Sequence, residues 1–198
     1  MINFKSLCND APYVLFKEKY DDAINANQNL IEAISIASYN QSVNEVDSRY
    51  INLKFIQNDE FIFFSNYNSP KSKAFISHDQ ISALIYWESI NVQIRIKANI
   101  KKTSYEFNQK YFFNRAKEKN ALAISSRQSE KISSYEDVVK NYKKSYKEDN
   151  CSQCPKYWGG FSFRPYYFEF WEGHESRVNK RVTYKKINTN WEKFIIQP

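Results

Sequence analysis

A succession of short segments rich in β-branched and aromatic residues, separated by polar turns, is the feature that most constrains the fold of this 198-residue chain. Residues 32–39 alternate small or polar side chains with larger ones, a polar turn follows, and residues 49–56 are again extended in character. This pair predicts a β-hairpin. Further strands are expected at residues 60–67, 81–88, 91–100, 161–172, 181–187 and 191–196.

Helical patterns occupy only a minor part of the chain. Apolar residues recur at helical spacing in residues 16–27, and two further helices are expected at residues 105–119 and 135–147. The strands do not alternate regularly with helices, as a doubly wound parallel sheet would require. The pattern therefore predicts a mainly β protein with flanking helices, built on an antiparallel sheet or barrel.

Composition favours one folded unit over residues 1–198. Hydrophobic residues make up 42% of the chain, with 15 Tyr and 15 Phe but only 3 Gly and 5 Pro, which excludes a disordered or low-complexity protein. No apolar run approaches the roughly 18 residues of a membrane span, and the N-terminal residues lack the apolar core of a signal peptide. We expect a cytoplasmic protein.

A net charge of +7 is compatible with an anionic partner, whether nucleic acid, a membrane surface or a phosphorylated small molecule. The densest lysine run, residues 140–147, falls in an expected helix, where a solvated face is the ordinary explanation. Residues 159–163, GGFSF, partly match an aromatic strand motif of RNA-binding domains, but the required βαββαβ order is missing. We expect neither a nucleic-acid nor a membrane partner.

The cysteines indicate a reducing compartment. Cys8, Cys151 and Cys154 leave one thiol unpaired in any disulfide scheme. The spacing of Cys151 and Cys154 is that of half a zinc site, but no second pair exists, and His78 and His174 show no ligand spacing. We expect free thiols in an exposed polar loop at residues 147–156, and no metal.

The densest group of motifs lies between Tyr157 and Tyr184. The pair of glycines in YWGGF (residues 157–161) indicates a place where the backbone turns or is approached closely. Residues 155–184 read PKYWGGFSFRPYYFEFWEGHESRVNKRVTY, which resembles the C-terminal signature of pyridoxamine 5'-phosphate oxidases: P-x-x-W-G-G-[FY], then E-F-W-x-G, spaced arginines and a Tyr. Upstream fragments SRYINLK, FIFFSNYNSPKSK, ALIYWESINVQIRI and KYFFNRAKEKNALAISSRQSEKI follow in the family's order, so the resemblance covers residues 10–198.

The resemblance implies a homodimeric split β-barrel that binds FMN at the subunit interface. It implies an N-terminal helical segment at about residues 10–30, and a C-terminal dimerisation and substrate segment at residues 151–198. The implied activity, in vitamin B6 metabolism, is oxidation of pyridoxamine or pyridoxine 5'-phosphate to pyridoxal 5'-phosphate with oxygen as electron acceptor. Alternatives are an oxidase for another small substrate, similar to the phenazine-pathway members, and a flavin-binding protein without turnover.

The same resemblance assigns the site residues. FMN contacts fall on Arg49, Lys54, Phe64, Ser65, Lys71, Gln93, Gln128, Ser129, Trp171 and Arg181. The substrate is assigned to Lys54, Tyr111, Arg115, Lys119, Arg177 and Asn179, of which Arg177 and Asn179 are the catalytic pair.

Two spacings carry geometric expectations. Arg49 and Lys54 are five positions apart, so in one regular strand they would point to opposite faces and serve different groups. Tyr111 and Arg115 are four apart, so on one helix they would share a face and could hold the same phosphate.

Three positions depart from the family pattern. Asn179 stands where the family usually has His, and Asn cannot become a cation or relay a proton near neutral pH. Pro70 replaces an Arg on the FMN phosphate, with Lys73 as the candidate to supply the missing donor. Lys119 replaces a Ser at the substrate phosphate, which adds positive charge.

Overall fold

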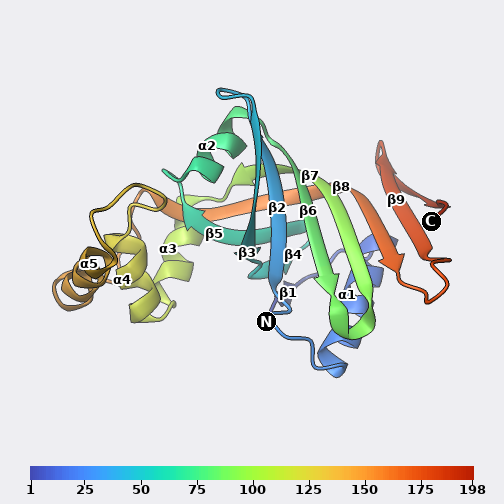
Figure 1. The fold of residues 1–198 in the computed structure, drawn as a ribbon, viewed down its shortest axis with the longest axis horizontal. Coiled ribbons are helices and arrows are strands. Elements are labelled where there is room, and N and C mark those ends of the chain that lie inside the picture. The colour runs from blue at the N-terminus through green and yellow to red at the C-terminus, as the bar shows by residue number, and fades with distance from the viewer.

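The computed structural model describes residues 1–198 and contains a ten-stranded, mainly antiparallel sheet that does not close on itself (Figure 1). Along the sheet the strands run in the order β1-β4-β5-β8-β7-β6-β2-β3, while β9 pairs with β8 and β10 with β9. The strands are β1 (Asn3–Lys5), β2 (Ala33–Asn40), β3 (Glu45–Asn52), β4 (Phe55–Gln57), β5 (Glu60–Asn66), β6 (Gln80–Trp87), β7 (Val92–Lys102), β8 (Trp158–Glu172), β9 (Lys180–Ile187) and β10 (Asn190–Ile195).

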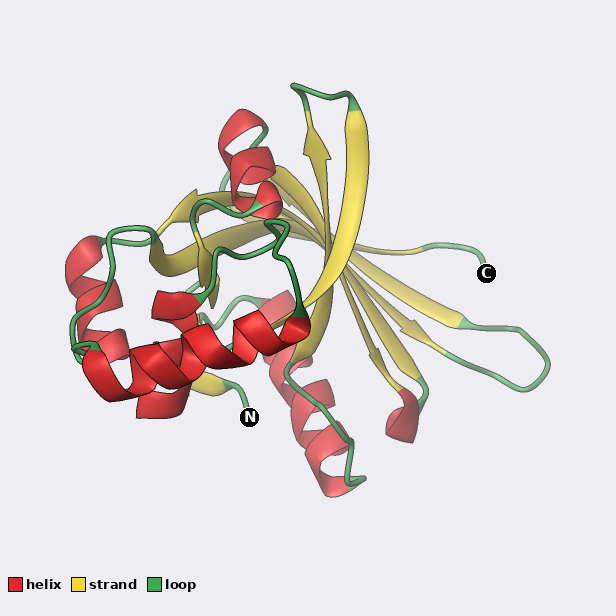
Figure 2. Cartoon of the chain, turned by 60° about the vertical axis from the view of Figure 1, so that its left-hand side comes forward, coloured by secondary structure: helices red, strands yellow, loops and turns green.

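The long strand β8 is where the sheet splits. One edge of β8 pairs with β7 along its length. Its other edge pairs with β5 up to Phe163 and then, from Tyr167 onward, with β9. A bulge at Tyr166 separates these two parts, next to Pro165, which has no N–H for the ladder. The β9–β10 hairpin therefore diverges from β5 (Figure 1), the strands spread apart from one another in Figure 2, and the architecture is the split barrel expected from the sequence.

The predicted strands are all present, including the β2–β3 hairpin, and in β2 and β6 the alternation corresponds to one buried and one more open face. Several bounds differ from the prediction: β3 already begins at Glu45, within the expected turn, β8 begins at Trp158, and residues 49–56 are not one strand. They divide between β3, which ends at Asn52, and β4, which starts at Phe55. The three-residue strand β1, which pairs in parallel with β4, is too short to leave a periodic signal and was not predicted.

The helices are α1 (Ala11–Asn25), α2 (Pro70–Ser77), α3 (Tyr105–Phe113), α4 (Lys117–Ser125) and α5 (Tyr135–Glu148), with a short 3₁₀ turn at Glu88–Ile90. The prediction of a single helix at residues 105–119 is wrong, since α3 ends at Phe113 with Asn114 as its C-cap and α4 begins at Lys117. Helix α2, which carries Pro70 in its first turn, was not predicted. No helix combines the length and the apolar character needed to cross a membrane.

The main core is a cluster of 28 buried residues between the inner face of the sheet and α1. Phe16 on α1 makes edge-to-face contacts with Phe61 at 5.2 Å and Trp87 at 5.6 Å between ring centroids. The helical spacing of the apolar residues in α1 thus corresponds to its buried face. A smaller cluster of Phe112, Cys154 and Trp158 joins α3 to the start of β8.

The loop before β8 is more buried than the sequence predicts. Cys151 is 7% exposed and Cys154 only 2%, so the expectation of an exposed loop is wrong at both cysteines. Burial raises the pKa of the Cys154 thiol to about 11. The thiols are free, and no three His, Cys, Asp or Glu side chains gather as metal ligands.

Candidate active site

A cleft of about 730 Å³ opens between β3, β5, the start of α2, and the α3–α4 region. Its twenty lining residues come from segments far apart in the chain, from Asp47 to Trp158. Ten of the residues assigned from the sequence line it: Arg49, Lys54, Phe64, Ser65, Lys71, Tyr111, Arg115, Lys119, Gln128 and Ser129.

Arg49 and Lys71 form the first of two cationic groups in this cleft. Arg49 is held by Ser38, to whose Oγ its Nη1 donates at 2.8 Å, and by an ion pair with Asp47. Lys71 has no carboxylate partner and contacts only the Ser69 hydroxyl, at 3.4 Å. Burial, and then the charge of Arg49, lowers the pKa of Lys71 to about 8. An anion in the cleft would offset this desolvated positive charge.

Neutral hydrogen-bonding groups lie beside this first group. The Ser65 hydroxyl on β5 contacts Gln128 Oε1 at 3.4 Å, and Asn66 Nδ2 donates to the Ser126 carbonyl at 3.3 Å. These contacts tie the loop after α4 to the end of β5. In that loop Ser129 adopts a left-handed backbone conformation with φ of 71°. Hydroxyl and amide groups beside two cations are the donors that a phosphate requires.

Lys54, Arg115 and Lys119 form the second cationic group. Burial is the main cause that lowers the pKa of Lys54, and the positive charges of Lys119 and Arg115 lower it further, against the opposing effect of Glu32. Glu32 lies 3.9 Å from Lys54 Nζ, whereas Arg115 and Lys119 have no carboxylate partner. The second group is therefore a concentration of positive charge with little internal compensation.

Backbone and amide contacts hold Arg115 in place. Its Nη1 donates to the Lys119 carbonyl at 2.9 Å and to Asn120 Oδ1 at 3.2 Å. The buried Asn120 in turn donates from Nδ2 to the carbonyls of Phe112 and Cys151, both at 2.8 Å. Burial lowers the pKa of the Arg115 guanidinium. The fixed Arg115 lies over the Trp158 ring, with its Cζ 5.0 Å from the ring centroid.

Aromatic rings from β5, β8 and α3 form one wall of the cleft. Phe64 stacks on Tyr111, with ring centroids 3.8 Å apart and ring planes 11° from parallel. Trp158 is also nearly parallel to Phe64, at 5.2 Å. Burial raises the pKa of Tyr111, and because its hydroxyl is protonated at neutral pH even without this shift, it is available as a hydrogen-bond donor. Trp158 was not assigned from the sequence as a site residue, although YWGGF contains it.

The structure corrects three expectations about side-chain placement. Arg49 and Lys54 line the same cleft, because β3 ends at Asn52 and the alternation of faces stops there. Arg115 lies beyond the end of α3, so it reaches the cleft beside Tyr111 without sharing its helix. Lys73, the candidate to supply the donor that Pro70 lacks, is exposed on α2 and does not line the cleft.

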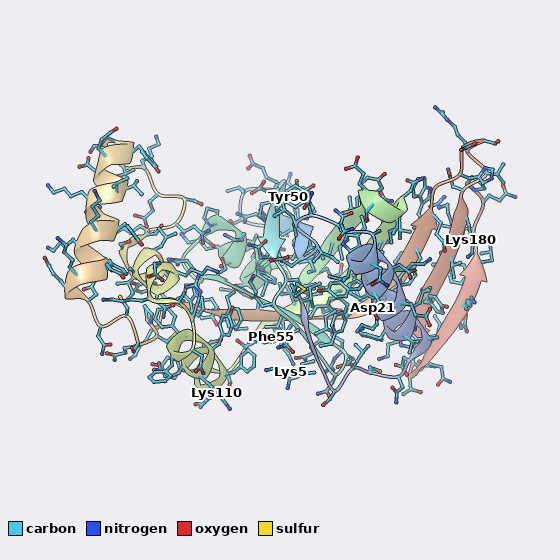
Figure 3. The ribbon with its side chains drawn as sticks, turned by 90° about the horizontal axis from the view of Figure 1, so that it is seen from below. Lys5, Asp21, Tyr50, Phe55, Lys110 and Lys180 are labelled. Atoms are coloured by element: carbon cyan, nitrogen blue, oxygen red, sulfur yellow. The ribbon has the colours of Figure 1, made fainter.

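Three of the five remaining assigned residues lie on β7, β8 and β9. Gln93 pairs in register with Trp171, and Trp171 with Arg181, so the three form one row across the strands. None of them lines the cleft. In Figure 3, Lys180 at the start of β9 lies at the opposite end of the molecule from Lys110 on α3. One chain therefore does not bring this row to the cleft.

Arg177 and Asn179 lie in the turn between β8 and β9. Asn179 Oδ1 accepts a hydrogen bond from the His174 backbone N–H at 3.0 Å, and the Arg177 N–H donates to the His174 carbonyl at 2.9 Å. Arg177 has a left-handed backbone conformation with φ of 59° and an exposed side chain. Asn179 thus shapes the turn that presents Arg177.

Comparison with known proteins places this architecture in the split β-barrel class. PhzG from Burkholderia lata, solved with tetrahydrophenazine-1-carboxylic acid, superposes with a TM-score of 0.89 at 23% identity, covering 94% of this chain and 92% of that one. A pyridoxamine 5'-phosphate oxidase-related, FMN-binding protein from Nostoc punctiforme superposes with a TM-score of 0.76 at 12% identity, covering 92% and 97%.

Sequence relatives identify the family. The model for the pyridoxine 5'-phosphate oxidase C-terminal dimerisation region matches residues 158–198. The pyridoxine/pyridoxamine 5'-phosphate oxidase of Cytophaga hutchinsonii is 32% identical over 193 residues, covering 95% of this chain and 89% of the relative. That of Colwellia psychrerythraea is 31% identical over 194 residues, covering 96% and 88%. The chain belongs to the pyridoxine/pyridoxamine 5'-phosphate oxidase family.

Proposed function

We propose that this protein is an FMN-dependent oxidase that converts pyridoxamine or pyridoxine 5'-phosphate to pyridoxal 5'-phosphate, with oxygen as electron acceptor and hydrogen peroxide as product. The observation that carries the proposal is the presence of two separate cationic groups in one aromatic-walled cleft. Each group suits one phosphate, one on the cofactor and one on the substrate.

The first group fits the FMN phosphate. Arg49 and Lys71 supply positive charge, and Ser65, Gln128 and Ser129 supply hydroxyl and amide groups around them. Burial and the charge of Arg49 lower the pKa of Lys71 against the opposing charge of Asp47, and a bound phosphate would stabilise the ammonium further. When bound, the flavin supplies the two-electron redox chemistry, and the chain's own residues hold and orient it.

The second group fits a phosphate on the substrate. Lys54, Arg115 and Lys119 surround a position that the Tyr111 hydroxyl also borders. Lys119 adds a charge where a hydroxyl is usual in the family, and a phosphate dianion is stabilised by that addition. A substrate without a phosphate would leave Arg115 and Lys119 without an anionic partner, and Lys54 with Glu32 alone.

We propose that two copies of the chain complete the site. The row of Gln93, Trp171 and Arg181, together with the turn that carries Arg177 and Asn179, is separated from the cleft within one chain. In a two-fold dimer the row and turn of one copy would meet the cleft of the other. The match of residues 158–198 to a dimerisation region supports this arrangement.

A second candidate is oxidation of another small substrate, as in the phenazine pathway. Asn179 favours it, because the ionisable imidazole usual at this position in the family is missing. The cationic group of Lys54, Arg115 and Lys119 favours the phosphorylated substrate instead, and we regard that as the stronger argument.

The visible spectrum of the purified protein and oxygen-dependent formation of pyridoxal 5'-phosphate test the proposal together. We expect a yellow protein that oxidises at least one of the two phosphorylated vitamers and releases hydrogen peroxide. A protein that cannot be reconstituted with FMN would contradict all flavin-based functions. A yellow protein that is inactive on both vitamers would leave the other-substrate and storage functions.

A further inference from the structure

A buried carboxylate on β8 lies outside the set of residues assigned to the site. Glu169 is 1% exposed, although it lies on the side of the sheet opposite the core residues Phe168 and Phe170. Its side chain is covered by three partners from two neighbouring strands and its own: Arg95 on β7, Arg181 on β9 and Tyr167 on β8.

The two oxygens of Glu169 have different partners. Oε1 accepts from Arg181 twice, from Nε at 2.9 Å and from Nη2 at 2.7 Å. Oε2 accepts from Arg95 Nη1 at 3.0 Å and from the Tyr167 hydroxyl at 3.0 Å. Each carboxylate oxygen therefore accepts two hydrogen bonds. The partners of one oxygen can be removed by mutation without removing those of the other.

These contacts leave Arg181 with a single orientation. Its third nitrogen, Nη1, donates to the Gln197 carbonyl at 2.8 Å, so the guanidinium is held on two sides. The N–H groups that remain free belong to Nη1 and Nη2 and point away from Glu169. Arg181 pairs in register with Trp171, which places these free donors in the row that also contains Gln93.

A buried carboxylate is costly unless it is paired, and a well-packed apolar residue is often at least as stabilising at such a position. Stability alone therefore gives little reason for a carboxylate here. Geometry gives a better one: an arginine side chain has many rotamers, and a buried carboxylate oxygen that accepts from two of its nitrogens selects one of them.

We propose that Glu169 is a positioning residue that orients Arg181 toward the flavin ring. The inference rests on the proposed function, because it takes Arg181 as an FMN contact. Glu169 itself touches neither cofactor nor substrate, and it acts by holding the guanidinium before FMN binds.

Titration of apo-protein with FMN, followed by quenching of flavin fluorescence, tests the proposal without an activity assay. Glu169→Gln keeps the shape but removes the charge, and its amide nitrogen cannot accept a hydrogen bond, so one uncharged oxygen is the only acceptor left for the two arginines. We expect the FMN dissociation constant to rise about tenfold or more, with the oligomeric state unchanged in sedimentation. Arg95→Ala is the matched control, since it removes a partner of the other oxygen, and we expect a change of less than about threefold.

A double-mutant cycle separates positioning from a general structural role. If Glu169 acts through Arg181, Glu169→Gln should have almost no further effect on FMN affinity in an Arg181→Lys background. Additive losses, an equal loss in Arg95→Ala, dissociation of the oligomer, or unchanged FMN affinity in Glu169→Gln would each overturn the inference.

Should Glu169→Gln fail to fold, Glu169→Asp replaces it in the same cycle. Aspartate keeps the charge but is one methylene too short to reach both arginines, so we expect weaker FMN binding that again disappears in the Arg181→Lys background. Wild-type affinity in Glu169→Asp would contradict the inference. Failure of the wild-type protein itself to bind FMN would be a different result, because it would contradict the proposed function.

Discussion

The Tyr111 ring stacks on Phe64 at 3.8 Å, and this contact joins α3 to β5 at the wall of the cleft. Phe64 lies on a strand that the sequence predicts, whereas Tyr111 is brought to it from a helix over forty residues later by tertiary packing. Because the stack fixes the ring, it also fixes the Tyr111 hydroxyl in the cleft that Lys54 and Arg115 line.

Tyr111→Phe should therefore weaken substrate binding without affecting the stability of the fold. The variant keeps the stacked ring and loses only the hydroxyl, so the melting temperature should change little. We expect KM for the phosphorylated substrate to rise about five- to tenfold, because one hydrogen bond to a phosphate is lost. Steady-state kinetics and a thermal melt check both parts, and an unchanged KM would remove Tyr111 from the substrate site.

FMN affinity should depend on pH through Lys71. Its pKa in the folded protein is about 8, below that of an ordinary lysine, so the ammonium is lost from the apo-protein as pH rises through 8. A phosphate binds the charged form, and FMN affinity should therefore fall between pH 7 and pH 9. Lys71→Met should bind FMN more weakly and lose this pH dependence, as fluorescence titrations at several pH values would reveal.

The same substitution, Lys71→Met, should weaken FMN binding but stabilise the apo-protein. In the folded apo-protein the pKa of Lys71 is depressed, so keeping the ammonium charged destabilises the fold at pH values below 8. Above pH 8 the penalty fades as the group loses its proton. Lys71→Met should therefore raise the melting temperature of apo-protein more at pH 7 than at pH 9. An equal increase at both pH values would indicate a packing effect.

Gly160→Ala should destabilise the protein, because a Cβ there would lie 2.5 Å from Thr103 Oγ1. That hydroxyl and Asn108 form a network in which the Gly160 N–H donates to Asn108 Oδ1 at 2.8 Å. We expect a loss of about 1–3 kcal/mol in the free energy of unfolding, measured with denaturant. Gly173→Ala is the control: the three atoms nearest to its Cβ all belong to the end of the Asn91 side chain in a turn, which can move away, and a smaller loss is expected.

Arg177→Ala should weaken substrate oxidation and leave FMN bound. Arg177 is exposed in the β8–β9 turn, so its removal should not disturb the core, and the turn retains the contact between Asn179 and His174. We expect a fall in kcat/KM of about tenfold or more, with the visible flavin spectrum unchanged. Loss of flavin would show instead that Arg177 belongs to the cofactor site.

Most of the sheet could be predicted from the sequence, because alternation of buried and open positions is a local property of each strand. In β6 every second residue from Ile81 to Trp87 is buried, as the pattern requires. Prediction failed where long-range contacts decide the outcome. The interruption between α3 and α4 depends on Asn114 and on Asn120, whose side chain bonds to Phe112 and Cys151. The parallel pairing of β1 with β4 leaves no local signal.

The sequence alone determined the strands, the family motifs and the residue types of the site, since each of these is carried by neighbours along the chain. Only the tertiary structure decided that Arg49 and Lys71 form one cationic group and that Lys54, Arg115 and Lys119 form another. It also placed the row of Trp171 and Arg181 beyond the reach of that cleft and enclosed Glu169 between two arginines. The physical reason is that burial and charge interactions depend on distance in space, which the order of residues does not specify.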